Sequence, residues 1–415
     1  MTTDDIDARI ATLTDDPARQ MAIMTTVKRL LPMLRNIAAN LRTIERVPML
    51  TAPQWNGPAF IVGGGPSLAQ LTPDLARVMS ERGVVFAVNT SEKPLRERGI
   101  TPTLCWCIES GATSFQIAES PREQQWALDL TCHPDSFKAA EGRCAWFLHE
   151  ALHLMELARC LGARPIWYGP AGPSAAFTFA RMMGCSPIVL VGCDMAYGRD
   201  GAMYDPSTHW HEIRITDLAN NGDHVVGTLS ESKARDDVMR KAGMKPIPPR
   251  RRMYQVPAAD GDEPLWTTPE FMSLNAWLAR EIAIMEPGRV VVQTGLARLD
   301  GAMSMPIESA LAGVRIPMDV PDVRIAHVDH ELQQKRIAAA LALIRREADA
   351  MSAVADAIEA GAQLPYARMA EGTAFGAAWS VPELLRFQMS DSGSDALARP
   401  AAIASIWRRA ARELV

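Results

Sequence analysis

Residues 61–68 read IVGGGPSL, and this stretch decides how the rest of the chain is interpreted. An apolar run ends in three glycines, Gly63 to Gly65, and the residues that follow, AQLTPDLARVM, have apolar positions at helical spacing. In an open α/β sheet, ligands bind beyond the carboxyl ends of the strands, where bare backbone and a helix N-terminus favour anions. We therefore treat this turn as a candidate binding site for a phosphate group.

Each residue type in the turn has a physical use. Glycine allows close approach and positive φ angles, Pro66 is suited to open a helical turn, and Ser67 adds a hydroxyl donor. The pattern is neither GxGxxG nor a Walker A loop, because the lysine and the spacing are missing. The alternative to a phosphate-binding turn is therefore a tight turn that binds no ligand.

Short apolar runs separated by helical stretches surround this turn. The runs are AFIVGG, GVVFAVN, TLCWCIE, CAWFL, RPIWYG and SPIVLVGCD. Such runs, without alternation of polar and apolar residues, indicate strands buried on both faces of a mostly parallel sheet. We predict an α/β fold with an open, Rossmann-like sheet over about 58–200. The run RVVVQTG (289–295) is a candidate further strand, which would leave a polar insertion between about 198 and 265.

The two ends of the chain differ from this core in composition and in the spacing of their apolar residues. Residues 4–47 carry apolar positions at helical spacing, and the chain from about 330 is rich in Ala, Leu and Arg. We therefore divide the chain into a helical N-terminal leader (1–50), an α/β domain (51–305) and an α-helical C-terminal region (306–415).

Composition limits the partners. A formal net charge of −5 gives no reason to expect nucleic acid, and the short basic run from Arg250 to Arg252, preceded by prolines, is expected to be a solvated loop. The first residues lack the features of an export signal, and no apolar run approaches the roughly 20 residues of a membrane helix. We expect a cytoplasmic protein without a membrane span.

Seven scattered cysteines without a CxxC pair indicate free thiols.

Polar residues close several of the predicted strands. Asn89 ends VVFAVN, Glu109 ends LCWCIE, and Asp194 ends IVLVGCD. Gly172 and Ser174 lie in GPAGPS, after PIWYG. Because the carboxyl ends of parallel strands share one edge, these residues outline a nucleotide-type site.

Two histidines follow the strand that ends at Asp194. His209 and His211 lie in STHWHE, and a general base needs a pKa near neutrality. Histidines two residues apart could equally be surface residues or ligands on a strand. We take His209 and Asp194 as the candidate catalytic residues.

A rival motif occurs at 149–153, where HEALH fits the HExxH pattern of helical zinc enzymes. The stretch FLHEALHLMELARCLG is expected to form an amphipathic helix between two strands, and the extended form of the motif is absent. We therefore predict no metal site there.

Together, several stretches resemble the MptE-like domain. They are PAFIVGGGPSL, GVVFAVNTSEKPLRERGITPTLCWCIES, GPSAAFTFARMMGCSPIVLVGCDMAYG, YDPSTHW and VVVQTGLARLDGAM, which occur in the family's order over about 50–305. This domain is shared by bacterial motility-associated factor (Maf) glycosyltransferases and archaeal 6-hydroxymethyl-dihydropterin diphosphokinases. The resemblance implies a sialyltransferase-like fold and a CMP-sugar donor.

The resemblance also implies roles for individual residues. The turn from Gly63 to Ser67 would meet the nucleotide, Asn89 would lie beside it, and Gly172 with Ser174 would hold its other side. His209 would deprotonate the acceptor hydroxyl. Glu109 would also line the nucleotide site, at a position where the family commonly has Asp.

The resulting expectation is a transferase that moves a nonulosonic (sialic-acid-like) sugar from its CMP donor to a hydroxyl acceptor such as a protein Ser or Thr. This reaction requires no metal. One alternative is a pterin diphosphokinase that uses ATP and Mg²⁺ held by Asp194 and Glu109. Another is a non-catalytic module that binds a nucleotide or a protein.

Overall fold

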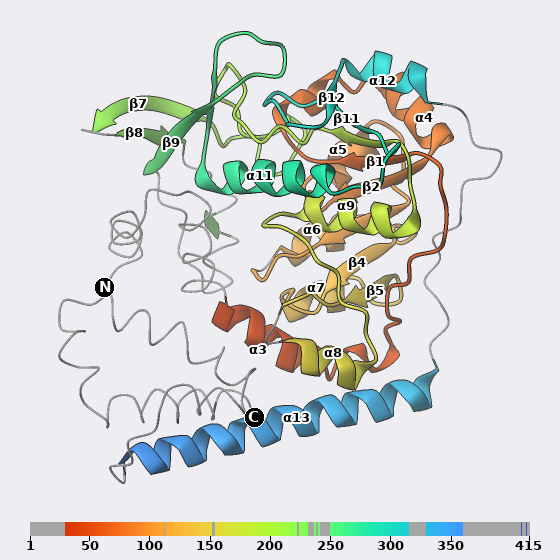
Figure 1. The fold of residues 1–415 in the computed structure, drawn as a ribbon, viewed down its shortest axis with the longest axis vertical. Helices are drawn as coiled ribbons and strands as arrows, with labels where there is room; N and C mark the ends of the chain where they lie inside the picture. The colour runs from red at the N-terminus through yellow and green to blue at the C-terminus, as the bar shows by residue number, and fades with distance from the viewer. Residues whose placement is uncertain are drawn as a thin grey trace.

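The computed structural model of the 415-residue chain describes residues 30–111, 113–151, 154–221, 224–230, 236–237, 240, 250–314 and 329–359, together with residues 408 and 412. Its main feature is an eight-stranded sheet in which every strand pairing is parallel (Figure 1). In chain order its strands are β1 (Ala59–Val62), β2 (Val84–Val88), β3 (Leu104–Cys107), β4 (Trp126–Asp129), β5 (Cys144–Phe147), β6 (Ile188–Val191), β11 (Val291–Gln293) and β12 (Met303–Ser304).

The strand order places a switch of direction at β1. The order is β12-β11-β6-β1-β2-β3-β4-β5, so the chain moves outward from β1 to β5 and then returns to pair β6 with the other side of β1. In open parallel sheets such a switch point is where ligands bind, because the connections leave the two strand ends in opposite directions.

Helices cover both faces of the sheet, and alternate residues of each strand enter two different cores. Phe60 and Val62 of β1 join the core beneath α4 (Pro73–Arg82), whereas Ala59 and Ile61 join the core beneath α9 (Gly172–Met183). The remaining helices of the domain are α5 (Glu92–Glu97), α6 (Ser114–Glu119), α7 (Pro134–Ala139), α8 (Met155–Leu161), α11 (Pro269–Ala283) and α12 (Ile307–Gly313). Burial on both faces explains why these strands read as continuous apolar runs.

The predicted α/β fold with an open parallel sheet is confirmed, and RVVVQTG supplies β11 beside β6. Two details of the prediction were wrong. RPIWYG forms only a single bridge, between Ile166 and His149, and not a strand. The prediction also missed β4, a run of four residues that ends in Asp129 and follows the polar stretch PREQQ.

The stretch between β6 and β11 forms a second, antiparallel sheet. Its strands, in the order β10-β9-β8-β7, are β7 (Ile215–Asn221), β8 (His224–Leu229), β9 (Arg250–Val256) and β10 (Leu265–Thr267). In Figure 1 the strands β7 to β9 extend to one side of the parallel sheet. The expectation of a solvated basic loop was wrong, because Arg250 to Arg252 lie in β9.

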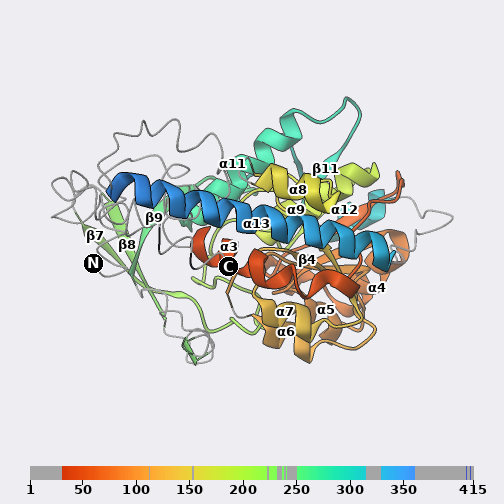
Figure 2. The same cartoon turned by 90° about the horizontal axis from the view of Figure 1, so that it is seen from below.

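Helices from both ends of the chain pack on the α/β core. The side chains of Leu34 and Ile37 in α3 (Leu30–Asn40) are fully buried in the same core as Phe60. The long helix α13 (His330–Glu359) runs along the outside of the molecule beside α8 (Figures 1 and 2). Gln333 of α13 donates to the backbone oxygens of Ile44 and Val47. Helical structure in both end regions therefore agrees with the sequence, while Met21 and its neighbours lie outside the described residues.

Two further sequence expectations can be compared with the structure. All seven cysteines are free thiols, and six of them are buried. Within the part of the chain that the structure describes, no helix combines the length and the apolar character needed to cross a bilayer.

Candidate functional site

The glycine-rich turn follows β1 at the switch point and packs against the end of β6. The backbone N–H groups of Gly63 and Gly65 donate to Val191 and Gly192, at 2.8 and 2.9 Å. A Cβ atom at Gly63 would lie 2.5 Å from the Gly192 oxygen, and one at Gly64 would lie 2.8 Å from the Thr90 hydroxyl oxygen. The glycines therefore allow close approach, but the groups that approach are other parts of this chain.

The positive φ angle that the sequence led us to expect in the turn occurs instead in the β6 segment that packs against it. None of Gly63 to Gly65, all within the described residues, has a left-handed backbone, whereas Gly192 after β6 has a φ of +62°. Pro66 opens a short 3₁₀ turn over Pro66–Gln70, as its position predicts.

Asp194 fixes the turn to β6 through its carboxylate. Its Oδ2 accepts from the Ser67 N–H at 2.8 Å, and its Oδ1 accepts from the Leu296 N–H at 2.9 Å. The residue is 3% exposed, and burial raises the pKa of the Asp194 carboxyl to about 6, although these hydrogen bonds act in the opposite direction. Its position indicates that Asp194 organises the turn, since both oxygens already accept bonds from the protein.

Asn89 directly follows β2 and contacts a residue that the sequence did not single out. Its Nδ2 donates to Oε1 of Gln116, on α6, at 2.7 Å. Gln116 is 1% exposed, and its Nε2 is buried without a hydrogen-bond partner in the described structure. A buried amide donor without an acceptor is unfavourable by roughly 1–3 kcal/mol, so this nitrogen is a candidate contact for a ligand oxygen.

Three further predicted site residues, Glu109, Gly172 and Ser174, differ in their contacts. The carboxylate of Glu109 follows β3 by two residues and is partly exposed. Gly172 brings the start of α9 against β2, because a Cβ there would lie 2.9 Å from Cγ1 of Val88. Ser174 is fully buried, and its hydroxyl donates to the Ala171 oxygen at 2.5 Å. Gly172 thus joins the end of β2, whereas the Ser174 hydroxyl is already used within its own helix.

The loop that carries the histidines is fastened across the ends of β1 and β2. The N–H of Asp205 donates to the Gly64 oxygen at 2.9 Å, and the Asp205 carboxylate pairs with Arg98 at 3.1 Å. The Lys93 ammonium donates to the Ser207 oxygen at 2.6 Å. These bonds hold the loop beside both the glycine-rich turn and α5.

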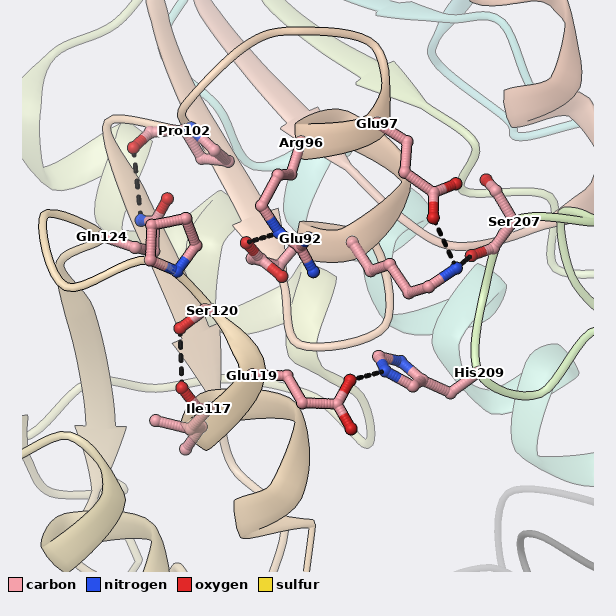
Figure 3. Close-up of polar contacts among 12 residues, drawn as sticks. Glu92, Arg96, Glu97, Pro102, Ile117, Glu119, Ser120, Gln124, Ser207 and His209 are labelled. Atoms are coloured by element: carbon pink, nitrogen blue, oxygen red, sulfur yellow. Dashed lines mark hydrogen bonds and ion pairs between the residues drawn. The ribbon is translucent and has the colours of Figure 1, made fainter.

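His209 points toward α6 from this loop (Figure 3). Its Nε2 lies 2.8 Å from Oε2 of Glu119, and its ring meets the Phe115 ring at 90° with centroids 5.2 Å apart. The His209 side chain is 13% exposed, and its Nδ1 is buried without a partner in the described structure. His211 is exposed, and its Nδ1 lies 2.9 Å from the Thr208 oxygen. The two histidines therefore have clearly different surroundings.

A second acidic residue belongs to α5. Glu92, the first residue of α5, is 2% exposed and pairs with Arg96 at 3.1 Å. Burial raises the pKa of the Glu92 carboxyl, and the hydrogen bond and positive charge of Arg96 act against this rise. Glu119 of α6 thus faces the histidine loop, whereas Glu92 of α5 pairs with Arg96 of its own helix (Figure 3).

The HEALH stretch is not the helix that the sequence predicted. His149 forms an extended bridge with Ile166, and α8 begins only at Met155. The second histidine of the motif, at position 153, lies outside the described residues. Glu150 and Ala151 are not helical either, so the described part of the motif differs from the helix on which the HExxH pattern depends.

Sequence reasoning missed the partners of the candidate residues. Gln116, Phe115 and Glu119 belong to α6, whose sequence SFQIAE resembles an ordinary short surface helix. The spacing of Phe115 and Glu119 predicts that they share one helix face. Nothing in the sequence pairs that face with a histidine 90 positions away.

Comparison with known proteins agrees with this architecture. Residues 32–200 match the model of a family described as 6-hydroxymethylpterin diphosphokinase MptE-like. None of the curated proteins compared matches the chain. Among solved structures, the chain is similar to the Maf glycosyltransferase from Magnetospirillum magneticum AMB-1, with a TM-score of 0.56 and 14% sequence identity.

This structural match covers 94% of the present chain and 59% of the Magnetospirillum protein, so the chain spans well under two thirds of that protein's length. The predicted family resemblance is confirmed by the match over residues 32–200. Residues 32–200 are therefore similar to the MptE-like family, and the chain shares its fold with a Maf glycosyltransferase.

Proposed function

We propose that this protein is a glycosyltransferase that moves a sugar from a nucleotide-sugar donor to a hydroxyl acceptor. The observation that carries the proposal is His209, whose loop is bonded to the glycine-rich turn through Asp205. One of its ring nitrogens lies on a carboxylate, and the other has no partner in the described structure. A histidine oriented by a carboxylate is the arrangement that general-base catalysis uses. The fold shared with a glycosyltransferase supports the reaction class.

The donor is proposed to be a CMP-activated nonulosonic acid, and the acceptor a hydroxyl group such as a protein Ser or Thr. The nucleotide would lie along the ends of β1 and β2, where the glycine-rich turn, Asn89 and the start of α9 meet. Gln116 would add an amide donor to this surface, since its Nε2 lacks an acceptor in the described structure.

The reaction would be a displacement at the anomeric carbon. His209 accepts the proton of the acceptor hydroxyl, the hydroxyl oxygen bonds to the anomeric carbon, and the bond from that carbon to the phosphate oxygen breaks. CMP leaves with the electron pair. The N–H groups of Gly63, Gly65 and Ser67 already donate within the protein, so the Gln116 amide is the donor proposed to stabilise the charge of the leaving phosphate. Because the His209 Nδ1 atom is closed to water, the acceptor must displace neighbouring groups to reach it.

A second candidate function is pyrophosphate transfer from ATP, which the description of the matching family favours. The Mg²⁺ of that reaction would need carboxylate ligands, and Asp194 was the first candidate. Asp194 fits this role poorly, because it is 3% exposed and both of its oxygens accept backbone N–H groups. We therefore place glycosyl transfer first.

A thermal-shift panel separates these functions, because a ligand that binds only the folded state raises the melting temperature. CMP should raise it without added metal. A rise only with ATP and Mg²⁺, or with a pterin, would favour the diphosphokinase instead. Binding of CMP without turnover of any CMP-sugar, across a panel of donors and hydroxyl acceptors, would indicate a non-catalytic nucleotide-binding module.

Calorimetry on two matched variants would locate the nucleotide. Asn89→Ala should weaken CMP binding about tenfold, the effect of one lost hydrogen bond of about 1.4 kcal/mol. The control is Asn275→Ala on α11. It removes an amide that donates to the Arg298 backbone oxygen at 2.9 Å, and it should leave CMP binding unchanged. Equal affinities of the two variants would remove Asn89 from the site.

A further inference from the structure

The two histidines of the loop carry their hydrogen on opposite ring nitrogens. The Nδ1 atom of His211 lies 2.9 Å from the Thr208 carbonyl oxygen, which can only accept, so Nδ1 of His211 carries a hydrogen. The Nε2 atom of His209 lies 2.8 Å from the Glu119 carboxylate, which also accepts. In the neutral ring, Nδ1 of His209 is therefore the bare nitrogen.

Helix α6 fixes the His209 ring at two points. Glu119 holds the Nε2 end, and the Phe115 ring packs at 90° against the imidazole. Phe115 and Glu119 are four residues apart, so they lie on one face of α6. The plane of the ring and the direction of its bare nitrogen are thus set by the same short helix.

The bare nitrogen is the part of His209 that no group satisfies. Within the described residues, Nδ1 is buried and has no donor. A buried acceptor without a donor is unfavourable, and a hydroxyl that donates to it would remove this deficit. The competing explanation is that the Glu119–His209 pair only fastens the loop to α6, because the Glu119 side chain is 54% exposed.

We propose that Glu119 is the positioning residue of His209, which holds the hydrogen on Nε2 and keeps Nδ1 as the nitrogen that accepts the hydroxyl proton. The assignment of the proton acceptor rests on the proposed glycosyl transfer, whereas the tautomer does not. In the step, the O–H bond of the acceptor breaks, an N–H bond forms at Nδ1, and the oxygen keeps the electron pair with which it attacks the anomeric carbon.

The tautomers can be read without any substrate. The full chain is labelled with ¹⁵N-histidine, and long-range ¹H–¹⁵N correlations are recorded at a pH where both rings are neutral. Signals are assigned with His209→Gln and His211→Gln. We expect the hydrogen on Nε2 of His209 and on Nδ1 of His211.

Variants of Glu119 then test its role. Glu119→Ala should give His209 a mixture of tautomers while His211 stays unchanged. Glu119→Gln retains an oxygen acceptor and should restore the Nε2–H form. Glu123→Ala removes an exposed carboxylate four positions away and should change neither ring.

Release of CMP from CMP-nonulosonic acids gives the second measurement. Glu119→Ala should lower kcat by roughly 10- to 100-fold, less than in buried catalytic triads because Glu119 is half-exposed. Glu119→Gln should recover part of this loss, and KM for the donor should change little.

Three results would overturn the proposal: a hydrogen on Nδ1 of His209 in the wild type, an unchanged tautomer in Glu119→Ala, or a changed tautomer with unchanged kcat. If the wild type turns over no CMP-sugar, the proposed function fails by itself. The tautomers of the wild type and Glu119→Ala then still decide whether Glu119 orients His209.

Discussion

Buried polar groups at the carboxyl edge of the parallel sheet fall into two regions that differ in how fully they are satisfied. Around Asp194, both carboxylate oxygens are used internally, since they accept from the N–H groups of Ser67 and Leu296, whereas the buried Ser67 hydroxyl has no hydrogen-bond partner in the described structure. Around α6, Gln116 and His209 each have a buried nitrogen without a partner in the described structure. A ligand can add hydrogen bonds at both nitrogens of the second region, whereas in the first it can add one at the Ser67 hydroxyl and would have to displace the existing bonds of Asp194.

A third residue shows that a raised pKa does not distinguish these regions. Asp129, at the end of β4, is fully buried, and burial raises the pKa of its carboxyl to about 6, as for Asp194. Its oxygens accept from the Thr131 N–H at 2.6 Å and the Tyr168 hydroxyl at 3.0 Å. Both carboxylates are explained by structure, because each accepts hydrogen bonds from the protein around it.

The largest effect is expected in the α6 region and falls on catalysis. His209→Ala should lower turnover of a CMP-sugar by roughly 10²–10⁴, the usual loss of a general base, with CMP affinity little changed. His211→Ala should cost far less, because its ring is exposed and bonds to its own loop. Equal turnover of His209→Ala and wild type, in folded protein that binds CMP, would remove His209 from the mechanism.

The next effect is expected in the Asp194 region and falls on stability. A Cβ at Gly65 would lie 2.2 Å from Oδ2 of Asp194 and 2.8 Å from the Gly192 oxygen, so Gly65→Ala should destabilise the protein by about 3 kcal/mol. Gly313→Ala, at the end of α12, meets no atom within 4 Å and is the control. Urea unfolding measures both, and similar midpoints would show that the turn can relax.

Removal of each carboxylate charge sharpens the comparison of Asp194 with Asp129. Asp194→Asn places an NH₂ group against a backbone N–H that can only donate, and should cost about 2 kcal/mol. Asp129→Asn should cost less, because the Tyr168 hydroxyl can turn and accept, although the His149 backbone N–H also faces Asp129. Urea unfolding at pH 7.5 tests the order, and a larger loss in Asp129→Asn would contradict it.

The smallest effect is a pH dependence that the two carboxylates share. Their folded pKa values of about 6 lie above the ordinary value of 3.8, so the folded state binds these protons more tightly than the unfolded state. Each group should therefore add about 1 kcal/mol of stability as the pH falls from roughly 7.5 to 5, and this gain is lost as the pH rises through 6. The gain, measured by urea unfolding, should shrink in each Asn variant. An unchanged pH profile in either variant would show that its carboxylate does not titrate in this range.

The sequence by itself determined the parallel sheet and the turn at its centre. Continuous apolar runs identify strands buried on both faces, and the position of Gly63 to Ser67 after the first of them places the turn at a strand end. Both signals are local, because they depend on residues adjacent in the chain. Where the local signal was weak, as in the four residues of β4, the prediction missed a strand.

Only the tertiary structure decided what the polar residues contact. It brought the glycine-rich turn after β1 against Asp194 after β6, although Ser67 and Asp194 are 127 positions apart in the chain. It also placed the His209 ring against the Glu119 carboxylate. It also placed His149 in an extended bridge, since Ile166 offers it a strand-like partner. Such pairings depend on the order of the strands in the sheet and on which loops cross the strand ends. The spacing of apolar residues within one segment therefore cannot predict them.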